Sequence, residues 1–487
     1  MKRRILVLEQ YARKLEPDPA SRKKARKQVI TYTETFLNRI EKEKAFVETA
    51  GNGIGLLTSP VSEQPMPMDK ALRLLHEHVD TPGLNPASGG HLGYIPGGGI
   101  YYAALGDYMA DIMNRYAGYF YASPGAVRME NMLLQWVASL IGYPATAAGN
   151  LSSGGSIANL SAVVTAREAK KIKARDVEKG VIYLTTHAHH CIEKALRIAG
   201  LGESVIRHIR VDAQYRMDRV ALENQIRKDK KAGLNPWLVV ASAGTTDTGS
   251  IDPLEEIARV ARKYSLWFHI DAAYGGFFVL TKTGKKKLKG LELSDSIVLD
   301  PHKGLFLPYG SGLVLVKKKE HLLQAHQFQA NYLQDLSPDL EEEHSPADLS
   351  AELTKHFRGL RFWLPLKLHG IKPFRACLEE KLLLAEYFYK EIQKAGFETG
   401  AEPELSVVAY RYIPKKGKKL AEKDINLFNE RLIKEVQKDG RIFISSTLLD
   451  NRFMLRFACL SFRTHLHTVD LLLKILKEKA RKLERAL

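Results

Sequence analysis

The chain has 487 residues, of which 45% are hydrophobic and 26% are charged. This composition excludes collagen-like, low-complexity and largely disordered proteins, and the length allows about three domains. Lys and Arg outnumber Asp and Glu by 73 to 55, giving a formal net charge of +18. That charge favours anionic partners but does not choose among small acids, phosphates, nucleic acids and membrane surfaces.

Cysteine usage and hydropathy indicate the compartment. The three cysteines, Cys191, Cys377 and Cys459, are scattered and include no C-x-x-C pair. They argue against a disulfide framework or a structural zinc site and favour a reducing environment. The basic start lacks the apolar core of a secretory signal, and no run approaches the roughly 20 apolar residues that span a bilayer. We expect a cytoplasmic protein without membrane contact.

The order of predicted elements indicates the fold class. Residues 1–90 predict an N-terminal helical arm interrupted by Pro- and Gly-rich loops. From 91 to 375, strand-like runs alternate with amphipathic helices such as 219–231 and 253–264, the second of which we expect Asp252 to cap. The predicted strands are 181–186, 205–211, 237–243, 266–271, 296–300 and 312–318. This alternation predicts an α/β three-layer sandwich around a mostly parallel sheet.

Residues 376–487 predict a smaller α+β domain. Its expected strands and helices cover 406–413, 425–440, 441–447, 453–459 and 470–487. Lys-rich segments at 282–290 and 413–420 fall between elements and contain no interleaved aromatic residues. We interpret both as solvated loops and predict no nucleic-acid partner.

The segment SIVLDPHKGLF carries the sharpest chemical signal. Lys303 follows the carboxyl end of a predicted buried strand, where open α/β sheets place their ligands. Its neighbours are apolar, and Pro301 and Gly304 favour a tight loop. An amine in such a setting is a candidate for a Schiff base with a carbonyl compound.

A carboxylate ends another predicted strand, in LWFHIDAAYGG. Asp271 is a poor core residue unless it has a cationic partner. A helix cap, a metal ligand and an acid that keeps a pyridine nitrogen protonated all remain open. The last of these is the requirement of pyridoxal-phosphate chemistry.

Two weaker signals lie upstream. A Ser- and Gly-rich turn at 152–156 precedes a helix, and such a turn can hold an anion. It matches neither the Walker lysine pattern nor G-x-G-x-x-G, so nucleotide binding is not supported. The histidines His187, His189 and His190 follow a strand. They leave open a metal site or an aromatic ring that stacks on a planar cofactor.

Taken together and in this order, these features resemble the pyridoxal-phosphate-dependent group II amino-acid decarboxylases. The resemblance runs from about Asp69 to Thr464, is densest at 91–99 and 123–144, and continues at 356–370. It is closest to the aromatic-L-amino-acid branch. It implies the fold of pyridoxal-phosphate-dependent transferases (fold type I), pyridoxal 5'-phosphate as cofactor and no metal.

The resemblance also implies roles for single residues. Lys303 corresponds to the lysine that forms the Schiff base with the cofactor, and Asp271 to the partner of the pyridine nitrogen. His189 would stack on one face of the ring, Ala273 would pack on the other, and Thr246 would contact the cofactor near the ring.

The phosphate end of the site follows from the same comparison. Gly155 and Ser156 would hold the phosphate, with Asp300 and His302 close by. Many aromatic decarboxylases have Asn where Asp300 stands, and Gly97 replaces a hydroxyl residue common in the substrate segment. A carboxylate beside a phosphate is unfavourable unless it is protonated or turned away.

Tyr332 matches the tyrosine that returns a proton to Cα from a mobile loop in this family, so we expect an amine product. Relatives with Phe there tend to form aldehydes instead, which leaves an aromatic aldehyde synthase as an alternative. The ordinary interpretation of Tyr332, an amphipathic surface tyrosine, also stays open.

Residues for substrate binding are Tyr94 and Pro96, which match an apolar wall, together with His189 and Thr354. Thr354 stands where plant relatives have Gly or Ser, and its hydroxyl favours tyrosine or dihydroxyphenylalanine over tryptophan. An acidic substrate such as glutamate or aspartate remains an alternative, given the net charge.

The family forms homodimers with the active site at the interface, so we expect residues 1–90 to wrap a second copy. Two other classes stay open: a basic non-catalytic scaffold, and a related lyase of phosphorylated long-chain bases.

Overall fold

The computed structural model describes residues 1–328, 343–414 and 420–486. Tyr332 and part of the Lys-rich segment 413–420 lie outside these residues. The chain divides into two units, which are described separately. One comprises Met1–His91 with Gln437–Phe443, and the other comprises Leu92–Val436 with Ile444–Leu487.

The first unit is mainly helical. Its helices are α1 (Lys2–Ala12), α2 (Pro19–Arg39) and α3 (Met68–Leu75). Asp18 begins α2 by accepting the N–H groups of Ala20 and Ser21 at 2.8 and 3.0 Å. All three helices are fully described and none contains a buried residue. Their apolar side chains therefore have little cover from this unit itself.

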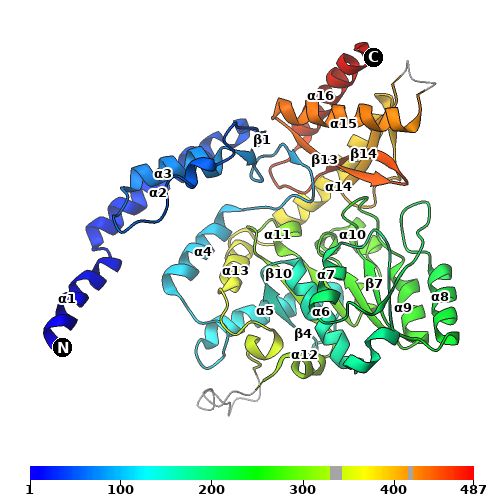
Figure 1. Ribbon diagram of the computed structural model, residues 1–487, viewed down its shortest axis with the longest axis horizontal. Helices are drawn as coiled ribbons and strands as arrows, with labels where there is room; N and C mark the ends of the chain where they lie inside the picture. The colour runs from blue at the N-terminus through cyan, green and yellow to red at the C-terminus, as the bar shows by residue number, and fades with distance from the viewer. Residues whose placement is uncertain (329–342, 415–419, 487) are drawn as a thin grey trace. The chain divides into compact units, whose positions relative to one another are not determined.

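The second unit is built on one large sheet, in the order β4-β10-β9-β8-β7-β5-β6 (Figure 1). Its strands are β4 (Ala148–Ser152), β5 (Gly180–Leu184), β6 (Val205–His208), β7 (Asn235–Ser242), β8 (Trp267–Asp271), β9 (Ser296–Leu299) and β10 (Gly312–Val316). The neighbours from β6 to β9 pair in parallel, whereas β10 pairs antiparallel with β9 and β4. The predicted mostly parallel sheet is confirmed, and β4 is an addition to it.

Helices cover both faces of this sheet, because successive strand residues point to opposite sides. In β10, Val314 and Val316 join one hydrophobic core, while Leu313 and Leu315 join the other. The covering helices are α5 (Pro124–Ile141), α6 (Gly155–Ala169), α7 (Cys191–Ile198), α8 (Arg219–Lys231), α9 (Leu254–Lys263) and α12 (Lys319–His326). Cores on both faces make the predicted three-layer sandwich, which is confirmed.

The C-terminal part is α+β, as predicted. Its elements are α14 (Lys372–Lys394), β11 (Phe397–Thr399), β12 (Val407–Tyr412), α15 (Glu422–Asp439), β13 (Phe443–Leu449), β14 (Arg452–Ala458) and α16 (Leu466–Arg485). The strands β11, β12, β14 and β13 pair antiparallel in that order. Phe388 of α14 stacks on Phe457 of β14 at 4.3 Å between ring centroids, which fixes the helix to the sheet.

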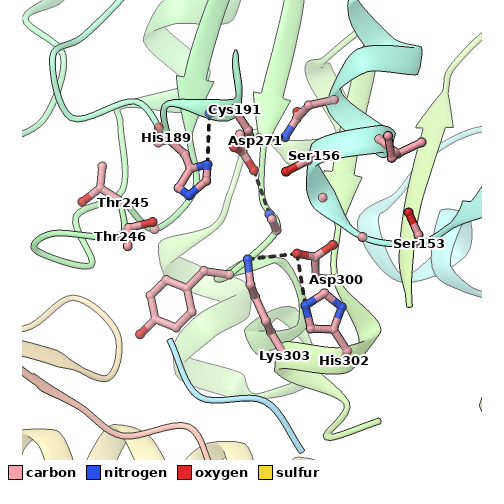
Figure 2. A pocket seen from close by; sticks show the side chains of 18 residues that line it. Ser153, Ser156, His189, Cys191, Thr245, Thr246, Asp271, Asp300, His302 and Lys303 are labelled. Carbon is pink, nitrogen blue, oxygen red and sulfur yellow. Dashed lines mark hydrogen bonds and ion pairs between the residues drawn. The ribbon is translucent and has the colours of Figure 1, made fainter. Parts of the chain in front are cut away.

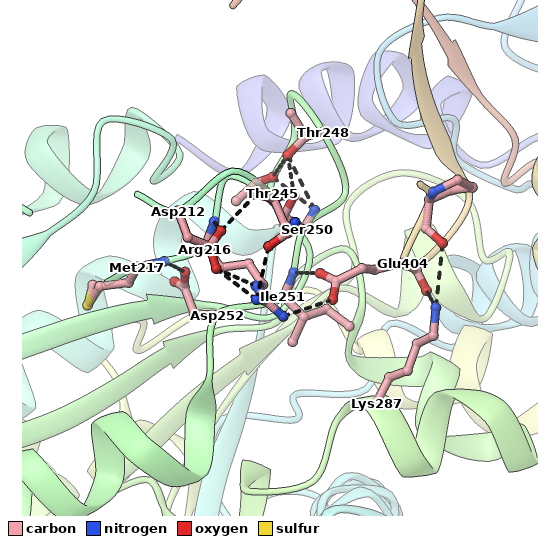
Figure 3. A network of polar contacts seen from close by, with 12 residues as sticks. Asp212, Arg216, Met217, Thr245, Thr248, Ser250, Ile251, Asp252, Lys287 and Glu404 are labelled. Atoms are coloured by element: carbon pink, nitrogen blue, oxygen red, sulfur yellow. Dashed lines mark hydrogen bonds and ion pairs between the residues drawn. The ribbon is translucent and has the colours of Figure 1, made fainter. Parts of the chain in front are cut away.

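Two local predictions are wrong. Asp252 does not cap α9; its buried carboxylate accepts the N–H groups of Met217 and Ser242 at 2.6 and 2.7 Å (Figure 3). Burial raises the pKa of Asp252 to about 6. The segment expected as a loop at 282–290 contains the short helix α10 (Lys282–Lys287). Among the described residues, no helix combines the length and the apolar run needed to cross a membrane.

Candidate active site

A cavity of about 280 Å³ lies at the carboxyl ends of the central strands (Figure 2). Its volume is near the lower end of the roughly 300–1,000 Å³ typical of small-molecule sites. The described residues that line it are Ser153, Gly154, Gly155, Ser156, Ile157, Asn159, His189, Cys191, Ser242, Gly244, Thr245, Thr246, Asp271, Ala273, Tyr274, Asp300, His302 and Lys303. All nine residues predicted to bind the cofactor therefore line one cavity.

Lys303 lies on the short helix α11 (Pro301–Gly304), which follows β9 directly. In Figure 2 its amine points into the space shared with Asp271 and His189. The Nζ atom is 2.9 Å from Oδ2 of Asp300. Burial lowers the pKa of Lys303, but the charge and hydrogen bond of Asp300, helped by Asp271, outweigh burial and raise it overall. In this state the amine is held as a cation.

Asp271 is the last residue of β8 and is 8% exposed. Its Oδ1 accepts the N–H of Ala273 at 3.1 Å, and its Oδ2 accepts the side-chain amide of Asn159 at 3.3 Å. Two donated hydrogen bonds stabilise a negative charge in a buried position. Asp271 is thus suited to hold a proton on a ring nitrogen.

The three histidines do not meet at one point: the rings of His189 and His190 lie 4.1 Å apart between centroids, and His187 has other partners. His189 lines the cavity, and its Nδ1 accepts the N–H of Cys191 at 3.3 Å. Burial lowers the pKa of His189, so the ring is neutral at physiological pH. His187 instead lies 3.8 Å from Asp247. Within the described ranges, no group of three or more His, Cys, Asp or Glu side chains is placed to hold a metal ion.

The Gly- and Ser-rich turn links β4 to the start of α6. Gly155 is the first residue of α6, so the helix N-terminus faces the cavity. A Cβ added to Gly155 would lie 2.9 Å from an oxygen of Asp300, and one added to Gly312 would lie 2.4 Å from the backbone of Gly154. Only glycine permits this close approach of turn, strand and carboxylate.

The loop that presents Thr246 is held by a chain of hydroxyl groups. The Thr245 hydroxyl lies 2.8 Å from that of Thr248, which lies 2.7 Å from that of Ser250 (Figure 3). Ser250 in turn donates to the Gln214 carbonyl at 2.7 Å. These bonds fix the loop while Thr245 and Thr246 line the cavity.

His302 lies at the other end of the cavity. Its Nδ1 is 2.6 Å from the Ser311 carbonyl, and its Nε2 is 3.7 Å from Asp300. Burial lowers the pKa of His302, so the neutral ring carries its proton on Nδ1, where the carbonyl accepts it.

The residues predicted for substrate binding are placed differently. Among the described residues that line the cavity, none is Tyr94, Pro96 or Thr354. Tyr94 is 57% exposed and has φ +52°, and its carbonyl accepts a hydrogen bond from Arg456 at 3.3 Å. Pro96 is buried and Thr354 is exposed. The substrate roles of all three stay predictions.

The structure explains why position 97 is a glycine. A Cβ at this position would lie 2.9 Å from the ring of Tyr309, so Tyr309 occupies the space that a side chain at 97 needs. Asn159 lines the cavity although the sequence pattern did not single it out, whereas Tyr309 is not among the described lining residues. Asn159 lies one helical turn beyond Gly155, on the face of α6 toward the cavity, and this spacing was the available signal.

The cavity has the groups that a pyridoxal-phosphate site needs. They are a lysine, a buried carboxylate, a neutral imidazole and a helix that begins with glycine and serine. The family described as "Pyridoxal-dependent decarboxylase conserved domain" matches residues 85–413. The chain belongs to this family and is a pyridoxal-phosphate-dependent amino-acid decarboxylase.

Similar proteins agree with this assignment. The chain is 32% identical over 450 residues to an aromatic-L-amino-acid decarboxylase of Bacillus atrophaeus, covering 90% of this chain and 91% of the relative. It is 27% identical to the Bos taurus aromatic-L-amino-acid decarboxylase, covering 94% and 96%. The crystal structure of Oryza sativa TDC with PLP and tryptamine superposes with a TM-score of 0.91 at 24% identity, covering 96% and 99%. That likeness confirms the predicted fold type.

The residues of the cavity fit this cofactor, and the group that fits least well is the carboxylate of Asp300. The carboxylate of Asp300 is 1% exposed, and its Oδ1 is buried without a hydrogen bond among the described residues. A phosphate held by Gly155 and Ser156 would share this region with that carboxylate, and like charges repel in a buried site.

Asp300→Asn is therefore expected to bind pyridoxal phosphate up to about tenfold more tightly. The substitution also removes the main anion that raises the pKa of Lys303, so the pKa of the lysine falls. Because the neutral amine is the nucleophile, the rate of cofactor attachment should reach half its maximum at a lower pH than in the unmodified chain. Stopped-flow absorbance across pH measures both effects. An unchanged pH midpoint would contradict the role of Asp300.

Proposed function

We propose that this decarboxylase converts an aromatic L-amino acid to its amine and carbon dioxide. The observation that carries the reaction is the convergence of Lys303, Asp271 and His189 on one cavity. The aromatic substrate class is supported by similarity to the aromatic-L-amino-acid decarboxylase of Bacillus atrophaeus and to a tryptophan decarboxylase of Oryza sativa.

The proposed roles of the cofactor residues are those that the family resemblance implies, and the common position of these residues on one cavity supports them. Bound pyridoxal phosphate supplies an aldehyde that condenses with amines and a ring that accepts the electrons left when the carboxylate departs. Lys303 would provide the attaching amine, and Asp271 would hold the proton on the pyridine nitrogen. His189 would cover one face of the ring and Ala273 the other, while Thr246 would contact its edge.

The phosphate would be held by Gly155 and Ser156 at the positive end of α6. His302 would stay neutral and orient the adjoining loop through Ser311. Asp300 would act on the amine of Lys303, which it contacts directly, and would set its protonation before the cofactor is attached.

The last step returns a proton to Cα, and we assign it to Tyr332 by resemblance, since this residue lies outside the described part of the chain. Tyr332→Phe is expected to lower amine formation by at least about a hundredfold, because general acids contribute about 10²–10⁴. Aldehyde, ammonia and hydrogen peroxide should appear instead, as dioxygen is consumed. Chromatography of the products with an oxygen electrode measures this. Undiminished release of amine alone would refute the assignment.

Substrate choice is tested with a panel of tyrosine, dihydroxyphenylalanine, tryptophan, phenylalanine, glutamate and aspartate, scored by kcat/KM for amine. We expect an aromatic substrate to exceed both acidic ones, and Tyr94, Pro96 and Thr354 are proposed to contact its side chain. A preference for glutamate or aspartate over every aromatic amino acid would overturn the aromatic proposal but not the decarboxylase assignment.

We further propose a cytoplasmic homodimer, with residues 1–90 as the dimerisation arm, 91–375 as the cofactor domain and 376–487 as the small domain. In support, α1 leaves Ile5, Leu6 and Leu8 more than half exposed, and all three described cysteines are free. A second copy would cover these exposed apolar side chains. Light scattering of the chain should give about twice the monomer mass.

A further inference from the structure

The carboxylate of Asp271 ends a row of buried polar groups that the reaction itself does not use. Asn159 Nδ2 lies 3.3 Å from Asp271, and Asn159 Oδ1 lies 2.8 Å from Nε2 of His269. His269 Nδ1 lies 2.8 Å from Oγ of Ser296, which accepts the indole N–H of Trp267 at 2.9 Å. The four side chains beyond Asp271 belong to residues that are at most 3% exposed.

The hydrogen bonds in this row have one consistent direction. A carboxylate only accepts, so the amide nitrogen of Asn159 must face Asp271 and the amide oxygen must face His269. The His269 ring therefore donates from Nε2. Burial lowers the pKa of His269 to about 4, so the ring is neutral and its Nδ1 must accept the hydroxyl proton of Ser296.

Trp267 closes the row, because an indole N–H can only donate. The indole N–H of Trp267 donates to one lone pair of Ser296 Oγ, so the hydroxyl proton of Ser296 can be donated to His269 Nδ1. Each bond thus fixes the next, from Trp267 to the carboxylate. Without the donor on His269, the amide oxygen of Asn159 would be buried without its partner, and the amide would no longer be held in the position from which it donates to Asp271.

We propose that Asn159 and His269 are positioning residues, which hold the Asp271 carboxylate negatively charged and correctly oriented for a protonated pyridine nitrogen. The inference rests on the proposed function, since it assigns Asp271 to that nitrogen. It extends the site to His269, Ser296 and Trp267, none of which lines the cavity among the described residues.

The test compares two ligands on the cofactor-free, full-length chain. One is pyridoxal phosphate, and the other is 1-deazapyridoxal phosphate, in which C–H replaces the ring nitrogen. In His269→Phe, the affinity for pyridoxal phosphate should fall about tenfold, as expected for a hydrogen bond to a charged group, while the affinity for the deaza compound should change less than about twofold. Fluorescence titration measures both constants.

Two further variants control the result. His269→Gln restores an N–H donor to Asn159, so its affinity for pyridoxal phosphate should stay within about threefold of the unmodified chain. His326→Phe removes another partly buried histidine of the same unit, whose ring contacts Thr165 at 3.4 Å instead of this row, and should leave both affinities unchanged. If His269→Phe does not fold, Asn159→Leu applies the same comparison to the adjacent group.

If His269→Phe lowered the affinity for both ligands equally, the role of His269 would be merely structural and the proposal would be overturned. The proposal would also be overturned if neither affinity fell. The outcome is distinct from failure of the proposed function. An unmodified chain that does not bind pyridoxal phosphate refutes the function, whereas normal binding with unaltered ligand preference in the variant refutes only the positioning role.

Discussion

Lys303→Ala should lower the rate of amine formation by at least about a thousandfold, which is the largest functional loss expected from any single substitution in this chain. Among the described residues that line the cavity, Lys303 is the one lysine. Because we propose Lys303 as the anchor, its removal should abolish the covalent attachment of the cofactor, and it leaves Asp300 without the amine that lies 2.9 Å from its Oδ2. Amine release measured by chromatography reports the loss.

The attachment itself is checked with borohydride, which reduces a lysine–cofactor bond to a stable amine that peptide mapping can locate. The label should fall on Lys303 and be absent from Lys303→Ala. Lys285→Ala is the matched control, because Lys285 is an exposed residue of α10 and should be labelled and active like the unmodified chain. A label on another lysine would show that the anchor has been misassigned.

The sequence predicted the parts of the site whose signals are local. Lys303, Asp271 and Gly155 each stand at the end of a strand or the start of a helix, and the carboxyl ends of parallel strands meet at one edge of the sheet. Because those strands were recognisable from apolar runs, the convergence of the three residues followed from topology.

Other parts depend on contacts between residues distant in the sequence. Strand β4 was not predicted, since AGNLS has weak strand propensity and is held by its antiparallel register with β10. Asp252 resembled a helix cap, but two backbone N–H groups from other elements compete successfully for its carboxylate. The packing of Tyr309 over Gly97 likewise has no local signal.

The same distinction explains why the residues predicted for the cofactor line one cavity, whereas Tyr94, Pro96 and Thr354 are not among its described lining residues. Cofactor groups are fixed by strand termini within one sheet, whereas Tyr94 and Thr354 lie in connecting segments outside the cavity lining that the structure describes. Arg456 of β14 donates to the carbonyls of both Tyr94 and Thr246. The β-sheet of the C-terminal part therefore holds the segments that contain these two residues. Such supports appear only once the chain is folded.

Lys355→Met should lower the free energy of unfolding by about 3–5 kcal/mol, the largest stability loss we expect from one substitution. Lys355 Nζ lies 2.7 Å from Oε2 of Glu130, and the two side chains are 0% and 1% exposed. The same amine donates to Oδ1 of Asn150 in β4 at 3.1 Å, and Glu130 Oε1 accepts the N–H of Gly359 at 3.0 Å. The pair therefore ties the segment after Thr354 to α5 and β4, and removing the cation leaves a buried carboxylate without a cationic partner.

The double variant Lys355→Met/Glu130→Gln should recover most of that loss, since it removes the uncompensated charge while keeping an acceptor for Gly359. Arg219→Met breaks an ion pair with Glu256 in which both side chains are more than 40% exposed, and should cost less than about 1 kcal/mol. Urea unfolding, followed by tryptophan fluorescence and circular dichroism, measures the free energy of unfolding of the three variants. If the double variant were as unstable as Lys355→Met, the loss would come from packing of the lysine chain and not from an isolated buried charge.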